Sequence, residues 1–415
     1  MRQSRFLVTW SAALVVMLVL VAGFNALINP YELFAWQRIP GINQFKPVTK
    51  NHVAFAKAYQ VERARPITVI IGTSRVYFAM DAQSPVWPEA NRPVYNYGIT
   101  GSNLTQLMSR ELRQAWATGR LRHAVAILDL PAFLEPDPPA EYGPDERRLL
   151  YRDDGTPNPD RNAQYLNDAF LSVLTLGALV DSVSTILARK GGDTVLDLRP
   201  DGTANAASFE EVARAEGVNA LFAQKDMFEL SRTAAYKHGL AGWSGPMPNI
   251  ARLHELIKFC LSHNISLTLI LGSSHADQME IYRRAGLWPY VEQLKIDLAK
   301  LVAEAHSDSI TAWDFVEYGP YTTEAVPRAG DRVTRLRWFW EPVHFQRALG
   351  EVMLRRVMTG SPAEYGVPLT LATVDARNQQ VRDQQRAFVG WRLACETNRQ
   401  AGCASSADML AAGPR

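Results

Sequence analysis

Three side chains of the types used in covalent acyl transfer stand near the two ends of the central part of the chain. Ser74 follows the short apolar run 67–71 after a Gly-Thr pair, and Glu341 stands three residues before His344. A serine hydroxyl becomes a good nucleophile when a neutral imidazole accepts its proton, and that imidazole needs an acceptor on its other nitrogen to orient it. We therefore predict Ser74 as nucleophile, His344 as general base and Glu341 as the orienting acid, with an acyl-serine intermediate.

These residues lie in segments that resemble the sequence blocks of the SGNH (GDSL-type) serine esterases. Residues 72–74 (Gly-Thr-Ser) resemble the nucleophile block, 96–101 (Asn-Tyr-Gly-Ile-Thr-Gly) the second block, and 340–345 (Trp-Glu-Pro-Val-His-Phe) the last block. The blocks occur in family order, and the resemblance covers residues 67–358. It implies a flavodoxin-like three-layer α/β domain with a mostly parallel sheet.

The resemblance also implies an oxyanion hole. Developing negative charge on the carbonyl oxygen needs fixed donors, and the matching donors here are the backbone N–H groups of Ser74 and Gly101. The family's third block normally adds an asparagine side chain, whereas residues 127–133 contain none. Asp129 cannot replace it while ionised, because a carboxylate only accepts hydrogen bonds. Either a two-donor hole or a loss of catalysis follows.

The departures from the family pattern point to one part of the superfamily. The usual acid is aspartate, and Glu341 is one methylene longer. In lacking this asparagine, the chain resembles envelope branches of the superfamily, which include the alginate O-acetylation proteins and the D-alanyl-lipoteichoic acid protein family. Those proteins also begin with a membrane anchor and act on cell-surface polymers. The resemblance implies a membrane-bound O-acyltransferase as partner if this chain is a transferase.

Each motif also has a purely structural interpretation. Gly-Thr-Ser after a strand often only caps a helix, because Ser and Thr satisfy free N–H groups at a helix start. His344 could simply begin the following helix, and Glu341 could be a solvated loop charge. Three functions stay open: an O-acetyltransferase or O-acetylesterase acting on a polysaccharide, a non-catalytic polysaccharide-binding or assembly component, and a hydrolase of lipids or small esters.

Further side chains near these segments are candidates for substrate binding. Arg75 could hold an anionic sugar or pair with an acidic neighbour. His275 with Asp277 could contact substrate or a metal, although such a run is more often a capped helix start. Aromatic rings near the site could stack on sugar faces or belong to the core. The full set of candidates is Arg75, Asn103, Asp129, His275, Trp338 and Trp340.

The elements that must position these residues alternate along the chain. Apolar runs predict five strands, and helical patterns between them favour a mostly parallel sheet covered on both faces. Ligands bind beyond the carboxyl ends of the strands in such sheets. We therefore expect the turns at Ser74, Gly101, Asp129 and His275 to gather on one rim. The predicted strands are 67–71, 93–96, 124–128, 266–271 and 309–313.

The remaining segments are predicted as additions to this domain, which covers 67–358. Residues 29–66 form a linker that contains a short helix at 52–63. An insertion at about 131–246, loop-like at first and helical at 165–189, indicates a helical subdomain or lid. Residues 359–415 form a C-terminal tail, with an amphipathic helix at 374–398 and a disordered end.

The N-terminal segment 1–28 is predicted to be a cytoplasmic tip and a transmembrane anchor. The run from Phe6 to Ile28 carries no charge and is long enough to span a bilayer core of about 30 Å. A cleavable signal peptide is the alternative, but its apolar core is usually only about 7–15 residues. Arg2 and Arg5 before the run favour a cytoplasmic N-terminus. We expect a single-pass protein of the bacterial inner membrane with a large periplasmic domain.

Composition excludes other classes of protein. The net charge of +2 comes without a basic stripe or tail, so nucleic acid is not an expected partner. No Cys/His set has the spacing of a zinc site, and neither a metal nor a cofactor is predicted. Cys260 fits a buried position in a helix, while Cys395 and Cys403 are close enough to form a disulfide in the periplasm.

Overall fold

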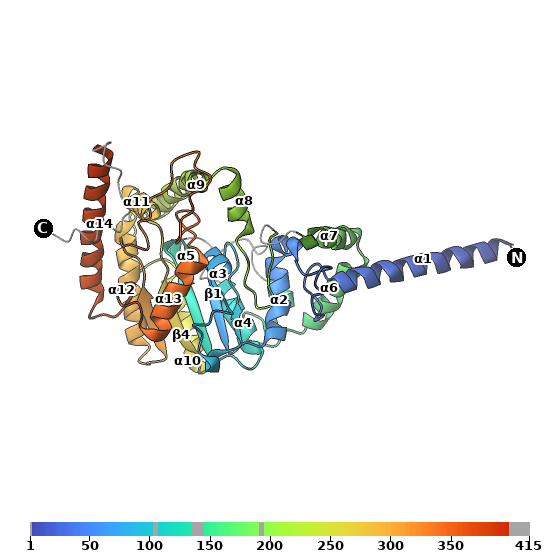
Figure 1. The fold of residues 1–415 in the computed structure, drawn as a ribbon. Coiled ribbons are helices and arrows are strands. Elements are labelled where there is room, and N and C mark those ends of the chain that lie inside the picture. The colour runs from blue at the N-terminus through green and yellow to red at the C-terminus, as the bar shows by residue number, and fades with distance from the viewer. Residues whose placement is uncertain (1, 103–106, 135–144, 191–194, 398–415) are drawn as a thin grey trace.

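The computed structural model describes residues 2–102, 107–134, 145–190 and 195–397, and it has an α/β architecture (Figure 1). Six strands form one sheet in the order β2-β1-β3-β4-β5-β6, and all neighbours are parallel except β5 and β6. The prediction of a mostly parallel sheet is confirmed. The strands are β1 (Thr68–Gly72), β2 (Val94–Asn96), β3 (His123–Leu128), β4 (Ser266–Leu271), β5 (Ile310–Asp314) and β6 (Val367–Pro368).

Helices cover both faces of this sheet. Successive side chains of a strand point to opposite faces, and in β1 both sets are fully buried: Val69 and Ile71 in one core, Ile70 in the other. A strand that is buried on both faces reads as a continuous apolar run, which is why β1 shows no alternation. The first core is completed by α2 (Val53–Ala64), α4 (Leu107–Ala117), α10 (Ile250–Ser262), α11 (Ala276–Arg284) and α12 (Trp288–Glu304), and the second by α3 (Ser74–Ala79) and α13 (Arg347–Thr359).

The C-terminal segment is part of the domain rather than an appended tail. β6 pairs with the end of β5, and α14 (Val374–Thr397) packs along α12. Arg377 of α14 is buried, and it forms ion pairs of 2.9 Å with Asp314 and 2.8 Å with Glu317. The helix was predicted from the sequence, but its ion pairs to the end of β5 and to the loop after it were not, because they join residues about 60 positions apart.

The segment predicted as a linker is folded onto the domain. Lys46 is buried, and its Nζ donates to Ile28 O at 2.6 Å and to Asn29 O at 3.0 Å. Arg38 forms an ion pair of 2.8 Å with Asp197. α1 (Arg2–Ile28), which is long and apolar enough to cross a membrane, is therefore fixed directly to the domain from which it projects (Figure 1).

The insertion between β3 and β4 divides into two parts. α6 (Arg161–Leu174) and α7 (Leu176–Leu187) pack against α1, on the side of the molecule from which α1 projects (Figure 1). α8 (Ala207–Ala215) and α9 (Val218–Gly239) pack on each other, and α9 also packs on α11. The insertion also contains the short helix α5 (Leu130–Leu134) and 3-10 turns at Glu146–Arg148 and Ala188–Lys190. Outside it, the described residues form 3-10 turns at Pro47–Asn51 and Glu89–Asn91.

Replacing Gly98 with alanine is expected to destabilise the fold by about 1–3 kcal/mol, the usual cost of overpacking. A Cβ at Gly98 would lie 2.5 Å from the backbone nitrogen of Tyr77 and 2.7 Å from Cβ of Val76, so α3 would have to move. Denaturant unfolding measures the change. Gly239→Ala is the control, because nothing lies within 4 Å of its added Cβ. Equal midpoints for the two variants would contradict the expected clash.

Candidate active site

Ser74 is placed by the sharp turn between β1 and α3. Gly72 ends β1 with φ of +150°, and a Cβ there would lie 2.6 Å from Val76 Cγ2, so only glycine fits this turn. Ser74 is the first residue of α3 and is partly exposed. The N–H groups of the first helical turn have no partner within their helix. The Ser74 N–H is therefore suited to donate to an oxyanion.

His344 and Glu341 share a tight turn directly before α13. Trp340 N donates to His344 O at 2.9 Å, and Gln346 N donates to Trp338 O at 2.7 Å, which closes the turn. The Glu341 carboxylate accepts the backbone N–H groups of Val343 at 3.2 Å and His344 at 2.8 Å. The three-residue spacing thus fixes the acid and the imidazole relative to each other.

The structure brings the three predicted catalytic side chains together. His344 Nε2 lies 2.6 Å from Ser74 Oγ, and His344 Nδ1 is hydrogen-bonded to Glu341 Oε1. Because a carboxylate only accepts, Nδ1 carries the proton and Nε2 is free to accept from the serine hydroxyl. This is the arrangement of a nucleophile, a base and an orienting acid.

Glu341 is held in its ionised form although it is buried, with 2% of its surface exposed. Burial acts to raise the pKa of its carboxyl, but the attraction and hydrogen bond of His344 outweigh it and lower the pKa below the ordinary value. An ionised acid at this place favours the imidazolium that forms when His344 takes the serine proton.

The second part of the insertion contributes to the walls around His344. Phe209 of α8 lies 5.4 Å from the imidazole ring and Phe78 of α3 lies 5.9 Å from it, both measured between ring centroids. Phe209 also stacks on Trp340 with 5.7 Å between centroids. No sequence pattern pointed to Phe209, because it lies in the insertion more than 130 residues from His344.

A cleft of about 300 Å³ opens beside this aromatic group. It combines rings with groups that form hydrogen bonds, a mixture suited to a polar substrate. Its lining residues include Phe78, Trp340, Asn205, Glu210, Arg214 and Arg347.

The Gly101 turn is tied to the nucleophile strand. Ile99 N donates to Gly72 O at 3.1 Å, and Ser102 N donates to Ile99 O at 3.1 Å. Gly101 has φ of +76° and is exposed, in a groove that it shares with residues of α2. Its approach to the carbonyl oxygen of a substrate stays a prediction.

Buried polar groups that were not predicted support this turn. Lys57 Nζ donates to Asn96 O at 2.7 Å and to Gly98 O at 2.8 Å, and burial lowers the pKa of Lys57 to about 7. Asn96 Oδ1 accepts from Gly98 N at 2.9 Å. Ser102 Oγ donates to buried Glu111 at 2.9 Å, and burial raises the pKa of that carboxyl well above its usual value.

Arg75 and Asp129 pair with each other beneath the rim. Arg75 Nε lies 3.2 Å from Asp129 Oδ2, and the guanidinium also donates to Ser273 O at 2.7 Å and Ser274 Oγ at 3.0 Å. Only 2% of Arg75 is exposed. Arg75 therefore forms an ion pair with an acidic neighbour, which was one of its two predicted roles. Because it is buried, its guanidinium is not accessible to an anionic sugar.

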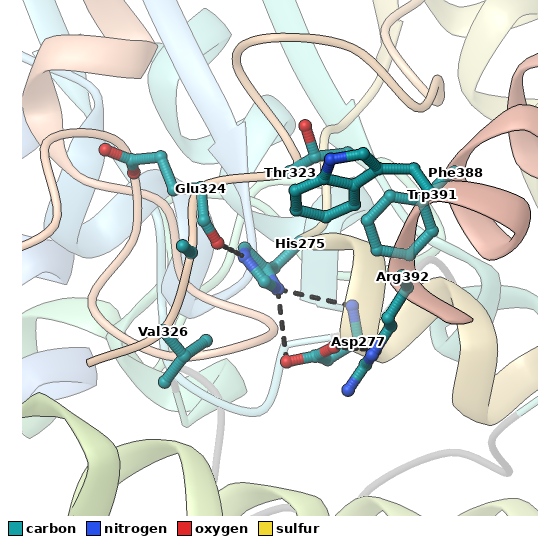
Figure 2. Close-up of a pocket in the computed structure, with 9 residues that line it drawn as sticks. His275, Asp277, Thr323, Glu324, Val326, Phe388, Trp391 and Arg392 are labelled. Atoms are coloured by element: carbon teal, nitrogen blue, oxygen red, sulfur yellow. Dashed lines mark hydrogen bonds and ion pairs between the residues drawn. The ribbon is translucent and has the colours of Figure 1, made fainter. Parts of the chain in front are cut away.

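His275 is a buried helix cap in the wall of a separate pocket (Figure 2). Its Nδ1 accepts from Asp277 N at 3.2 Å and its Nε2 donates to Glu324 O at 2.9 Å, so both nitrogens are used. Burial lowers the pKa of His275. The pocket has a volume of about 300 Å³, and α14 supplies its aromatic side through Phe388 and Trp391. His275 N donates to Pro342 O at 3.0 Å, which joins this pocket to the turn of Glu341.

The other predicted binding residues lie in different surroundings. Trp338 packs on Tyr321 with 5.0 Å between ring centroids, and the guanidinium of Arg337 lies over its ring. Of the two predicted tryptophans, only Trp340 lines the cleft. Asn103 and the side chains of Cys395 and Cys403 lie outside the described residues, and Cys260 is buried and free. Within the described ranges, no group of three or more His, Cys, Asp or Glu side chains could hold a metal ion.

Asp226→Asn is expected to stabilise the protein at pH 7.5 and to have little effect near pH 4. Burial, together with the nearby charges of Asp277 and Glu341, raises the pKa of Asp226 to about 6. The folded state then binds the Asp226 proton more tightly than the unfolded state does. Ionisation of Asp226 above pH 6 therefore lowers the free energy of unfolding, whereas below pH 4 the carboxyl is protonated in both states and this loss is absent. Thermal unfolding at both pH values measures it, with exposed Asp308→Asn as control. A variant less stable than wild type at pH 7.5 would contradict this sign.

Comparison with protein-family models, with curated proteins and with solved structures finds no match to this chain.

Proposed function

We propose that this chain is a membrane-anchored acyl-ester enzyme with an SGNH-type domain, which works through an acyl-serine at Ser74. The observation that carries the proposal is the distance of 2.6 Å between Ser74 Oγ and His344 Nε2, with Glu341 bound to the other imidazole nitrogen. The order β2-β1-β3-β4-β5 is also the flavodoxin-like doubly wound order, which has its ligand site beyond the carboxyl ends of the strands.

The proposed reaction has two steps. Ser74 Oγ bonds to the acyl carbon as its proton passes to His344 Nε2, and the ester oxygen leaves with that proton. Water, or a hydroxyl of a second sugar, then gives a proton to His344 and attacks the acyl carbon, and Ser74 Oγ leaves with that proton. Glu341 orients the imidazole throughout, and the N–H groups of Ser74 and Gly101 donate to the carbonyl oxygen.

The substrate class that we propose is an O-acetylated polysaccharide of the envelope or an exopolysaccharide. The cleft next to the Phe78 and Trp340 rings supports it, because an aromatic ring suits a sugar face and the guanidinium of Arg347 suits hydroxyls. A chain held by α1 in the inner membrane would work on such polymers in the periplasm. If a sugar hydroxyl rather than water accepts the acetyl group, the chain is a transferase and needs a supply of acetyl groups. The proposed supplier is a membrane-bound O-acyltransferase.

A non-catalytic role in polysaccharide binding or assembly is the second candidate. One observation favours it: Asp129, in the segment where the resemblance expects an asparagine, is engaged by Arg75 and by Ala132 N and offers no donor. Only the two backbone donors then remain for the oxyanion.

Acetate release tests the proposal. The full chain, purified in detergent, is incubated with an O-acetylated polysaccharide and with the same polysaccharide after chemical deacetylation, and the Ser74 peptide is analysed by mass spectrometry after an acid quench. We expect acetate from the first polymer only, and an acetyl group on Ser74. Binding of both polymers without acetate release or acetylation would select the non-catalytic role.

A further inference from the structure

The two helices beside α1 carry their apolar side chains on the outside. Leu166, Phe170, Leu176, Val180 and Leu187 are exposed over 57% to 76% of their surface. Leu171 and Val183 extend the same face. A helix of a soluble domain turns such residues toward the core, and exposed apolar patches of this kind usually mark an interaction site.

The inward faces of α6 and α7 are polar. Asp168 is buried, bound by Arg148 at 2.7 Å and by the Tyr59 hydroxyl at 2.5 Å. The buried residues of the two helices are Arg161, Gln164, Asp168, Ser172, Ala178, Ser182 and Thr185. The two helices therefore bury mainly polar residues and expose apolar ones, which is the reverse of the arrangement in a helix that faces water. An apolar medium around the outer face would account for this arrangement.

The charges on these helices follow the same division. Between Leu166 and Leu187, a stretch that the structure describes throughout, no charged side chain is exposed, because Asp168 is buried and Asp181 is half-buried. Arg189 and Lys190, directly after α7, are exposed. Basic residues at the border of an apolar face suit the headgroup region of a membrane.

The apolar face continues the surface of α1. Asn25 Nδ2, near the end of α1, donates to Val173 O of α6 at 2.9 Å, and the Tyr31 hydroxyl donates to Asp181 of α7 at 2.6 Å. Figure 1 shows α6 and α7 flanking the end of α1. Any membrane that surrounds α1 up to its end therefore meets these helices.

We propose that α6 and α7 lie in the leaflet from which α1 emerges, with their outer faces against lipid acyl chains. The helices have 14 and 12 residues and meet at a bend of 66°. At about 1.5 Å per residue, neither can cross a core of about 30 Å, so a position in the interface fits them. The inference rests on the anchoring role of α1 in the proposed function, and it is independent of chemistry at Ser74.

Fluorescence quenching in nanodiscs of phosphatidylcholine and phosphatidylglycerol tests the inference. The full chain, with Cys395 and Cys403 replaced by serine, carries an environment-sensitive fluorophore at Phe170→Cys or Val180→Cys. Val19→Cys in α1 reports anchoring, and Val333→Cys, 87% exposed on a loop of the domain, reports water. Quenching is measured with brominated acyl chains and with iodide.

We expect positions 170 and 180 to behave like position 19: emission shifted to shorter wavelength, strong quenching by brominated lipid and weak quenching by iodide. Position 333 should show the reverse. Iodide quenching at 170 and 180 with a lipid-quenched position 19 would overturn the inference, because it would show that this face lies in water. Iodide quenching at position 19 as well would overturn both the inference and the anchor, without touching the triad.

Discussion

Replacement of Ser74 by alanine is expected to lower kcat for acetate release by roughly 10⁴-fold or more, the range found when a serine nucleophile is removed from such a triad. The acyl-serine cannot form, because His344 Nε2 would face a methyl group where it now lies 2.6 Å from a hydroxyl. The measurement is initial acetate release from the acetylated polymer, with intact mass spectrometry to detect acylation.

Ser309→Ala is the matched control for this variant. Ser309 is exposed and directly precedes β5, so it lies at the end of the sheet opposite to the catalytic rim. It should retain wild-type kcat. Equal turnover by Ser74→Ala and wild type would show that another group is the nucleophile and would remove the basis of the proposed function.

Glu341→Gln is expected to lower kcat by about 10³- to 10⁴-fold while KM changes little, as happens when the acid of a triad becomes an amide. The amide group would donate toward His344 Nδ1 and favour the tautomer with a proton on Nε2, which cannot accept from Ser74. Glu341→Asp keeps the charge but is one methylene shorter, so we expect a smaller loss. Steady-state kinetics on the acetylated polymer measures both.

The controls for Glu341 must separate chemistry from folding, because the carboxylate also accepts two backbone N–H groups of its own turn. Glutamine keeps an oxygen that can accept one of them, and thermal unfolding shows whether the turn survives. Exposed Glu304→Gln at the end of α12 should behave as wild type. A folded Glu341→Gln variant with unchanged kcat would mean that Glu341 does not orient the base.

The predicted strands and the catalytic set came from local signals that the sequence carries directly. β1, β3, β4 and β5 lie within one residue of the predicted runs, because strands buried on both faces are continuous apolar stretches. The meeting of Ser74 with His344, 270 residues later, follows from the rule that strand ends gather at one edge. The sequence shows the order of the motifs that contain Ser74 and His344. The folding of the parallel sheet brings these two residues together.

Features that depend on distant partners could not be predicted. Arg75 next to a nucleophile suggests substrate binding as readily as an ion pair, and only the neighbouring strand ends show that Asp129 and Ser273 surround it. The contact of Phe209 with His344 depends on how the insertion folds back. The apolar pattern of α6 and α7 was visible as helical, but a periodic pattern does not tell which face points inward.

The firm attachment of residues 29–46 limits how the rim that carries Ser74 and His344 can move relative to α1. A flexible tether would let a domain sample a wide shell of heights and orientations. In this chain two residues of the segment are held by their surroundings. Lys46 binds the end of α1, and Arg38 binds Asp197 of the domain. The rim therefore stays at a set distance from the end of α1. If α1 anchors the chain as proposed, a substrate would reach Ser74 only at that height above the membrane.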